Sequence, residues 1–237
     1  MQRYFAKDKI DDNIILEISD MHHIKNVMRM NSNDKIECIY NKKLYICRVG
    51  DININSFEII EELDDNNELP IEITIAVSLV KEQKMDLILQ KLTELGVSRI
   101  IPLKTERSIV KIDDKRFKKK KDRWISICKE ASEQSKRNII PEITDIKTIK
   151  ELNDYEYDLK LFGSVSNKDN LVNKYLQKNN KYAKIIFVIG SEGGLSPKEE
   201  ELLTSMNYIP TSLGNRVLRV ETATFYIASI LNYSSMR

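Results

Sequence analysis

Short apolar runs separated by polar turn residues fill the first third of the chain, and this pattern is typical of β-strands. The runs follow one another at roughly the spacing of a small β-barrel: residues 3–5, 13–18, 35–40, 44–49 and 56–60. Residues 19–30 have helical spacing instead, and Ser19 is the predicted N-cap. The expected apolar face of this helix consists of Met21, Ile24, Val27 and Met28. The pattern predicts a small β-rich unit with one amphipathic helix.

From Pro70 onward, apolar strand-like runs alternate with amphipathic helical segments, which indicates an α/β fold with a mostly parallel sheet. The predicted strands are residues 73–79, 99–103, 159–163, 184–189 and 208–213. After the first strand, one helix has apolar residues at helical spacing and ends at Gly96. Its apolar positions are Met85, Ile88, Leu89, Leu92 and Leu95.

A long helix is expected over about residues 113–136. Its predicted buried positions are Phe117, Trp124, Cys128 and Ala131. Its predicted outward positions are Glu130, Glu133 and Arg137.

Residues 61–70, EELDDNNELP, separate the two patterns. They contain few apolar residues and end in a proline, which is typical of a linker. We therefore expect an N-terminal domain of residues 1–69 and a C-terminal domain of residues 70–237.

The composition favours a globular protein with a sizeable core, because 41% of the 237 residues are hydrophobic. No apolar stretch approaches 18 residues, and the first residues are charged, so a cytoplasmic protein without a membrane segment is expected. Cys38, Cys47 and Cys128 form no CxxC pair, which indicates free thiols and no metal site.

The net charge of +2 is unevenly distributed. Residues 115–123 contain seven cations, and their two equally weighted interpretations are RNA contact and a solvated helix face.

The most informative stretch is GSEGGLSPKEEELL, residues 190–203, which places three of the seven glycines within five positions after a predicted strand. Ser196, Pro197 and Glu199 predict a capping box that opens a helix. The loop matches no phosphate-binding motif and contains Glu192, so a neutral or cationic nucleoside-like ligand fits better than an anion. A tight turn without a ligand is the alternative.

A second strand-to-helix loop, SLGNRVLRVETA, contains Gly214. Open α/β sheets bind ligands at the carboxyl edge of their strands, so one pocket shared by the two loops is predicted.

Together, IGSEGGLSPKEE and LGNRVLRVETA resemble the paired signature of the RsmE-type methyltransferases of the SPOUT superfamily, which make N3-methyluridine in small-subunit ribosomal RNA. The resemblance extends to MQRYF, HHIKNVMRM, QKLTELGVSRIIPL, TERS and EASEQSKRNIIPEI, and so to nearly the whole chain. Ser191, Val217 and Val220 depart mildly from the family pattern.

The resemblance implies a PUA-like N-terminal barrel that binds RNA and a C-terminal trefoil knot that binds S-adenosylmethionine. It also implies a homodimer that acts on 16S ribosomal RNA or the small ribosomal subunit. The implied cofactor-binding residues are Leu161, Phe162, Gly163, Ile189, Gly190, Gly193, Gly194, Leu213, Gly214, Val217 and Leu218.

Methylation of uracil N3 requires removal of its proton and stabilisation of the resulting anion. Arg219 is the candidate for charge stabilisation, and Glu221 or Glu133 for handling the proton or orienting that arginine. Their alternatives are structural: Glu133 with Arg137 as a surface ion pair, and Glu221 as a helix cap.

The candidates for contact with RNA phosphates are Arg3, Lys25, Arg29 and Arg137, with members of Lys118 to Arg123. His22 and His23 are expected at the surface or facing RNA rather than in catalysis.

Two other functions remain open. A ribose 2′-O methyltransferase of the same superfamily is disfavoured because QKLTELGVSRI lacks the asparagine of the N-x-G-x-x-x-R element. A non-catalytic RNA-binding or assembly protein of the same fold is disfavoured by the intact glycine loops and the LRVETA segment.

Overall fold

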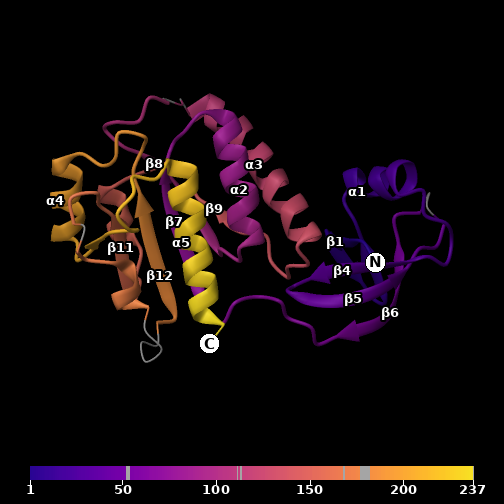
Figure 1. Cartoon of the computed structure of the whole chain (residues 1–237). Coiled ribbons are helices and arrows are strands. Elements are labelled where there is room, and N and C mark those ends of the chain that lie inside the picture. Colours follow the sequence, from indigo (N-terminus) through magenta and orange to yellow (C-terminus); the bar gives the residue numbers. More distant parts are fainter. Residues whose placement is uncertain (52–53, 111, 113, 168, 177–181, 237) are drawn as a thin grey trace. The chain divides into compact units, whose positions relative to one another are not determined.

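The structure is a computed structural model that describes residues 1–51, 54–110, 112, 114–167, 169–176 and 182–236 (Figure 1). The chain forms two compact units. One consists of Met1–Glu68 with Lys129–Ile139, and the other of Leu69–Cys128 with Ile140–Arg237. The division at Glu68 falls in the expected linker segment, but the return of residues 129–139 to the N-terminal unit was not expected from the sequence.

The N-terminal unit contains a six-stranded sheet of order β1-β4-β5-β6-β3-β2. Its strands are β1 (Arg3–Phe5), β2 (Asp8–Ile10), β3 (Asn13–Ile15), β4 (Lys35–Tyr40), β5 (Lys43–Arg48) and β6 (Phe57–Leu63). Within this sheet, β1–β4 is the only parallel pair among the described residues, and the other strands pair antiparallel. Side chains from several strands, among them Ile14 of β3, Ile36 of β4 and Phe57 of β6, are buried together and form the core of this unit.

The helix of this unit differs from the prediction. Helix α1 (Ile18–His22) begins after Glu17, without a side-chain cap, and continues directly into a π-helical turn, η1 (His23–Val27). The π-turn changes the periodicity, because its hydrogen bonds span five residues rather than four. Of the expected apolar face, Ile24 is fully buried, whereas Val27 and Met28 are 60% and 42% exposed.

The C-terminal unit is built on a parallel sheet of order β10-β8-β7-β12-β11-β13, with β9 paired to β8. Its strands are β7 (Glu72–Ser78), β8 (Arg99–Lys104), β9 (Glu142–Ile143), β10 (Lys147–Thr148), β11 (Leu159–Gly163), β12 (Lys184–Ile189) and β13 (Ile209–Thr211). The predicted parallel sheet is therefore confirmed. The strand β11 lies between β12 and β13, so the chain crosses from one side of β11 to the other between β12 and β13, and the carboxyl ends of the three strands lie at one edge.

The helices of this unit cover both faces of the sheet. They are α2 (Glu82–Glu94), α3 (Asp114–Gln134), η2 (Lys150–Asp154), η3 (Val172–Tyr175), α4 (Pro197–Ser205) and α5 (Val220–Ser235). Figure 1 shows α5 alongside α2, and both helices contribute to one core cluster together with the first part of α3. Leu203 of α4 and Leu152 of η2 belong to a separate cluster formed with the other side chains of the strands. The capping box of α4, with Ser196 as N-cap, is confirmed.

The long helix α3 contributes to both units, since Cys128 belongs to one and Lys129 to the other. The predicted buried positions are confirmed, with Trp124 only 2% exposed. The prediction that Glu133 and Arg137 point outward was wrong, because they are 8% and 3% exposed within the N-terminal unit.

Candidate active site

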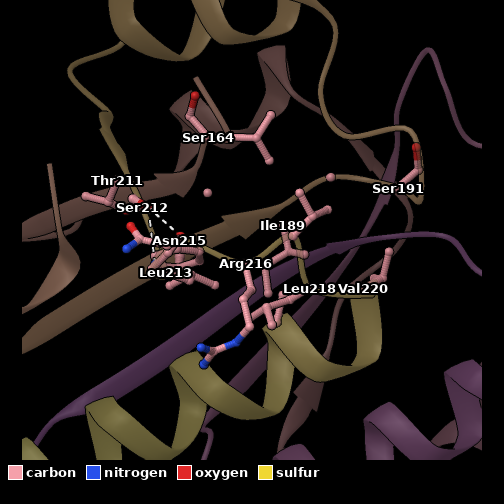
Figure 2. A pocket seen from close by; sticks show the side chains of 17 residues that line it. Ser164, Ile189, Ser191, Thr211, Ser212, Leu213, Asn215, Arg216, Leu218 and Val220 are labelled. Carbon is pink, nitrogen blue, oxygen red and sulfur yellow. Dashed lines mark hydrogen bonds between the residues drawn. The ribbon is translucent and has the colours of Figure 1, made fainter. Parts of the chain in front are cut away.

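A cavity lies at the carboxyl edge of the parallel sheet, where the loops after β11, β12 and β13 meet the start of α5 (Figure 2). It contains about 740 Å³ of space outside the atoms, including solvent at its mouth. The lining residues are Gly163–Val165, Phe187, Ile189–Ser191, Thr211–Leu218, Val220 and Ala223. The order of the strands explains the site, because β11 lies directly between β12 and β13.

Many of the expected cofactor residues are part of this lining: Gly163, Ile189, Gly190, Leu213, Gly214, Val217 and Leu218. Leu161 and Phe162 are fully buried in β11 and pack into the two cores on opposite faces of the sheet. Gly193 and Gly194 are not part of the lining; they belong to the turn that follows Gly190 in the sequence.

The backbone of the first loop is tightly folded. A Cβ at Gly190 would lie 2.7 Å from the backbone carbon of Gly194 and from the nitrogen of Leu195, so only glycine permits this close approach. Gly194 has a φ of +72°, and its N–H donates to the carbonyl of Ser191 at 2.8 Å.

The second loop is shaped by Gly214, which has a φ of +115°. Its N–H donates to the Ser212 hydroxyl at 3.2 Å, and that hydroxyl lies 3.2 Å from the Gly214 carbonyl oxygen. A Cβ at Gly214 would meet open space, so glycine is required there by the backbone conformation and not by packing.

Five polar residues of the lining were not named individually from the sequence: Ser164, Thr211, Ser212, Asn215 and Arg216. Of these, Ser212, Asn215 and Arg216 belong to the loop SLGNRVLRVETA, for which a shared pocket was predicted, whereas Ser164 and Thr211 were missed. Figure 2 shows these side chains with those of Leu213 and Leu218 around the same cavity. Their sequence signal was their position at or just after the carboxyl end of a predicted strand, where a side chain reaches the sheet edge.

The candidate catalytic residues Arg219 and Glu221 lie together at the start of α5, on either side of the cavity-lining Val220. Arg219 occupies the N-cap position and is exposed. Glu221 Oε2 is buried and has no hydrogen-bond partner among the described residues, although the Lys84 ammonium lies 3.5 Å away. The same ammonium is 3.0 Å from Glu192, and this hydrogen bond lowers the pKa of Glu192.

Glu133 belongs to the N-terminal unit. Its Oε1 lies 2.8 Å from the Lys129 ammonium and 3.3 Å from the Phe5 N–H. Burial raises the pKa of Glu133, although the hydrogen bond from Lys129 opposes this shift. Glu133 therefore forms a buried ion pair with Lys129. The structural alternative considered from the sequence was an ion pair of Glu133 with Arg137 at the surface.

The four candidates for RNA contact have different environments. Arg3 is 2% exposed and pairs with Glu37 at 2.8 Å, while Arg137 is 3% exposed and pairs with Glu68 at 2.5 Å. Because both guanidinium groups are buried in ion pairs, the structure does not fit the expectation that they contact phosphates. Lys25 and Arg29 are exposed on and after η1.

In the basic run, the cations at the middle of α3 are paired with acids of the same unit. Lys120 lies 2.7 Å from Glu82, Lys121 lies 2.7 Å from Asp145, and Arg123 pairs with Glu82. This arrangement supports the interpretation as a charged helix face.

Neither histidine belongs to a possible metal site in the part of the chain that the structure describes. His23 Nδ1 lies 2.9 Å from the Tyr4 hydroxyl, and His22 is exposed. Within the described residues, no cluster of three histidine, cysteine or acidic side chains is arranged to hold a metal, and no helix is long and apolar enough to cross a membrane.

Comparisons with known proteins agree with this architecture. The family described as "RNA methyltransferase domain" matches residues 67–232, and "RNA methyltransferase PUA domain" matches residues 17–62. Ribosomal RNA small subunit methyltransferase E of Bacillus subtilis is 36% identical over 250 aligned positions, which cover 99% of this chain and 97% of the relative.

Solved structures share this fold over nearly the whole chain. Ribosomal RNA small subunit methyltransferase E from Neisseria gonorrhoeae, bound to S-adenosyl methionine, is 30% identical with a TM-score of 0.86, and 98% of this chain and 97% of that chain are covered. A Legionella pneumophila methyltransferase in complex with the cofactor SAM is 29% identical with a TM-score of 0.89, at the same coverage. The chain therefore belongs to the RNA methyltransferase family that includes the ribosomal RNA small subunit methyltransferases E.

Proposed function

We propose that this protein transfers a methyl group from S-adenosylmethionine to N3 of a specific uridine in 16S ribosomal RNA. The observation that carries the proposal is the cavity at the ends of β11, β12 and β13, together with the family membership of the whole chain. The alternatives would share the fold, so the chemistry of the site decides between them.

The lining fits the cofactor. Phe187, Ile189, Leu213 and Leu218 provide apolar surface for a base. The hydroxyl groups of Ser164, Thr211 and Ser212 donate to Glu200, Phe162 and Gly214, so their oxygens are available as acceptors for the hydroxyl groups of a ribose. No carboxylate is among the lining residues that the structure describes, so the sulfonium charge would be met by backbone carbonyls and hydroxyl oxygens. The open space beside the α-carbon of Gly214 is volume that a side chain would take from a ligand.

S-adenosylmethionine supplies an electrophilic methyl group when it is bound. The protein holds this group and the uridine in line, which converts the transfer into an intramolecular step. Arg219 stabilises the negative charge that develops on the uracil when N3 loses its proton. Glu221, whose buried Oε2 has no hydrogen-bond partner among the described residues, takes the proton or orients Arg219.

The proposal extends to RNA binding and assembly. Lys25 and Arg29, which are exposed, contact RNA phosphates and position the substrate. The protein acts in the cytoplasm as a homodimer, and its C-terminal unit contains a trefoil knot. The family membership of the whole chain supports the knot, and the crossing of the chain past β11 to form β13 is one of the crossings that a knot requires in addition to threading through a loop.

The test is methylation of 16S ribosomal RNA and of small subunits from cells that lack the protein, followed by mass spectrometry of the nucleosides. N3-methyluridine at one position is the expected product. A 2′-O-methylated nucleoside would support the ribose methyltransferase instead. Absence of S-adenosylmethionine binding in calorimetry would leave only the non-catalytic function.

A further inference from the structure

The TERS segment, Thr105–Ser108, has no role in the function proposed above. It follows β8, which is separated from β12 by β7 in the sheet. Nevertheless, three consecutive residues of this segment make hydrogen bonds that lead to the glycine turn after β12 or to the helix that follows it.

The inner contact is a chain of hydroxyl groups across the strand ends. Ser78, the last residue of β7, is fully buried, and its Oγ donates to the carbonyl of Ile189 at 3.2 Å. The Thr105 hydroxyl lies 3.0 Å from the same Oγ. Since a serine hydroxyl has a single hydrogen, Thr105 is the donor in this second bond. The cavity-lining Ile189 is thus connected through β7 to the end of β8.

Two outer contacts reach the glycine turn and α4. The Glu106 N–H donates to Glu199 Oε1 at 2.9 Å, in the capping box that begins α4. Arg107 Nη1 donates to the carbonyls of Gly193 and Leu195, at 2.7 and 3.0 Å. These two carbonyls flank Gly194, the residue with positive φ.

We propose that Arg107 is a positioning residue that holds the glycine turn, residues 190–195, in the conformation that binds the cofactor. This inference rests on the proposed function for the identity of the ligand. Glycines give a turn many accessible conformations, and fixing them during binding would reduce affinity. Arg107 fixes them beforehand. It is an exposed side chain, so its removal disturbs the turn without opening the core.

The experiment compares Arg107→Ala and Arg107→Lys with the wild-type protein. Arg123→Ala is the matched control, because Arg123 is also an exposed, paired arginine of this unit but contacts Glu82 and Asp86 on α2. Calorimetry measures the Kd for S-adenosylmethionine, steady-state kinetics separate KM from kcat, and hydrogen exchange of the ligand-free protein reports on the Gly194 amide.

For Arg107→Ala, we expect the Kd and the KM for S-adenosylmethionine to rise about tenfold, with kcat at saturating cofactor within about twofold of wild type. The Gly194 amide should exchange faster, whereas amides within β12 should keep their protection. The melting temperature should change by no more than about 2 °C, as for an exposed substitution. Arg107→Lys should recover most of the affinity, because one nitrogen makes both native hydrogen bonds and an ammonium group has enough donors.

An unchanged Kd in Arg107→Ala would overturn the inference. A parallel loss of β12 protection and melting temperature would also overturn it, because Arg107 would then support the fold in general. If the wild-type protein binds no S-adenosylmethionine, the proposed function fails. The exchange rate of the Gly194 amide in Arg107→Ala still decides in that case whether Arg107 orders the turn.

Discussion

Substitution of Gly190 by alanine tests the connection between the glycine turn and the cavity most directly. The added Cβ would lie 2.7 Å from two backbone atoms of Gly194 and Leu195, whereas ordinary contact begins at 3.4 Å. The turn must therefore move by 3.4 − 2.7 = 0.7 Å to restore ordinary contact. The neighbouring atoms are backbone, so no side-chain rotation can relieve the collision.

Overpacking of this kind costs about 2 kcal/mol, the middle of its usual range. For a domain of this size, that corresponds to a decrease in melting temperature of about 4 to 8 °C. Because Gly190 also lines the cavity, we expect a loss of S-adenosylmethionine affinity of at least about tenfold, since displacements near 1 Å have large effects in preorganised sites.

The assay combines calorimetry with thermal unfolding, and Gly50→Ala is the control. A Cβ at Gly50 would meet no atom within 4 Å, and its φ is not positive. Gly214→Ala gives a second comparison, because its methyl group meets open space and only the positive φ costs energy, about 1 to 2 kcal/mol. Gly190→Ala with wild-type affinity would show that the turn does not form the cofactor site.

Three further predictions concern the catalytic and N-terminal residues. Arg219→Ala should keep the Kd for S-adenosylmethionine and lower kcat by about 100-fold, as measured by calorimetry and methyl transfer; an equal loss of both would make Arg219 a binding or structural residue. Burial acts to raise the pKa of Glu37, but hydrogen bonds from Arg3 and Lys136 outweigh the effect of burial and hold this pKa below 4.5. Glu37→Gln should therefore reduce the free energy of unfolding by about 2 kcal/mol at pH 7. This difference between the variant and the wild type should vanish as the pH falls from 4.5 through the lowered pKa, because the wild-type carboxyl is then neutral too. A difference that stays constant down to pH 2 in denaturant unfolding would contradict the ion-pair explanation. Replacing Lys25 and Arg29 by alanine should weaken binding to cognate and scrambled RNA alike. The slope of the logarithm of the binding constant against the logarithm of the salt concentration should decrease by about 0.7 to 0.9 for each lost phosphate contact. An unaltered slope in filter binding would indicate that these side chains are only solvated.

Local patterns in the sequence predicted five of the seven strands of the C-terminal sheet and its principal helices, but not the two-residue strands β9 and β10. The runs at 159–163 and 184–189 correspond to β11 and β12 without change, and Ser196 caps α4 as predicted. These features depend on hydrophobic periodicity, glycine stops and capping residues, all of which act within a few residues. The clustering of glycines after the strands also indicated where the cavity would be.

Contacts between distant residues decided what local patterns could not. The π-turn η1 removed Val27 and Met28 from the buried face, and its hydrogen bonds leave no mark in the pattern of apolar positions. Arg3 and Arg137 are charged, so the sequence pattern predicts them at the surface. Each is buried in the structure, because an acidic residue far away in the sequence forms an ion pair with it.

The cavity shows the same distinction. The sequence placed glycines in two loops, but only the return of β13 beside β11 brings those loops together. Arg107 reaches the glycine turn across β7, from a loop 86 residues earlier in the chain than Gly193. Sequence alone determines which segments can form strands, helices and tight turns, because those preferences are local. The order of strands in the sheet, and therefore which side chains share a site, follows from the packing of the whole unit.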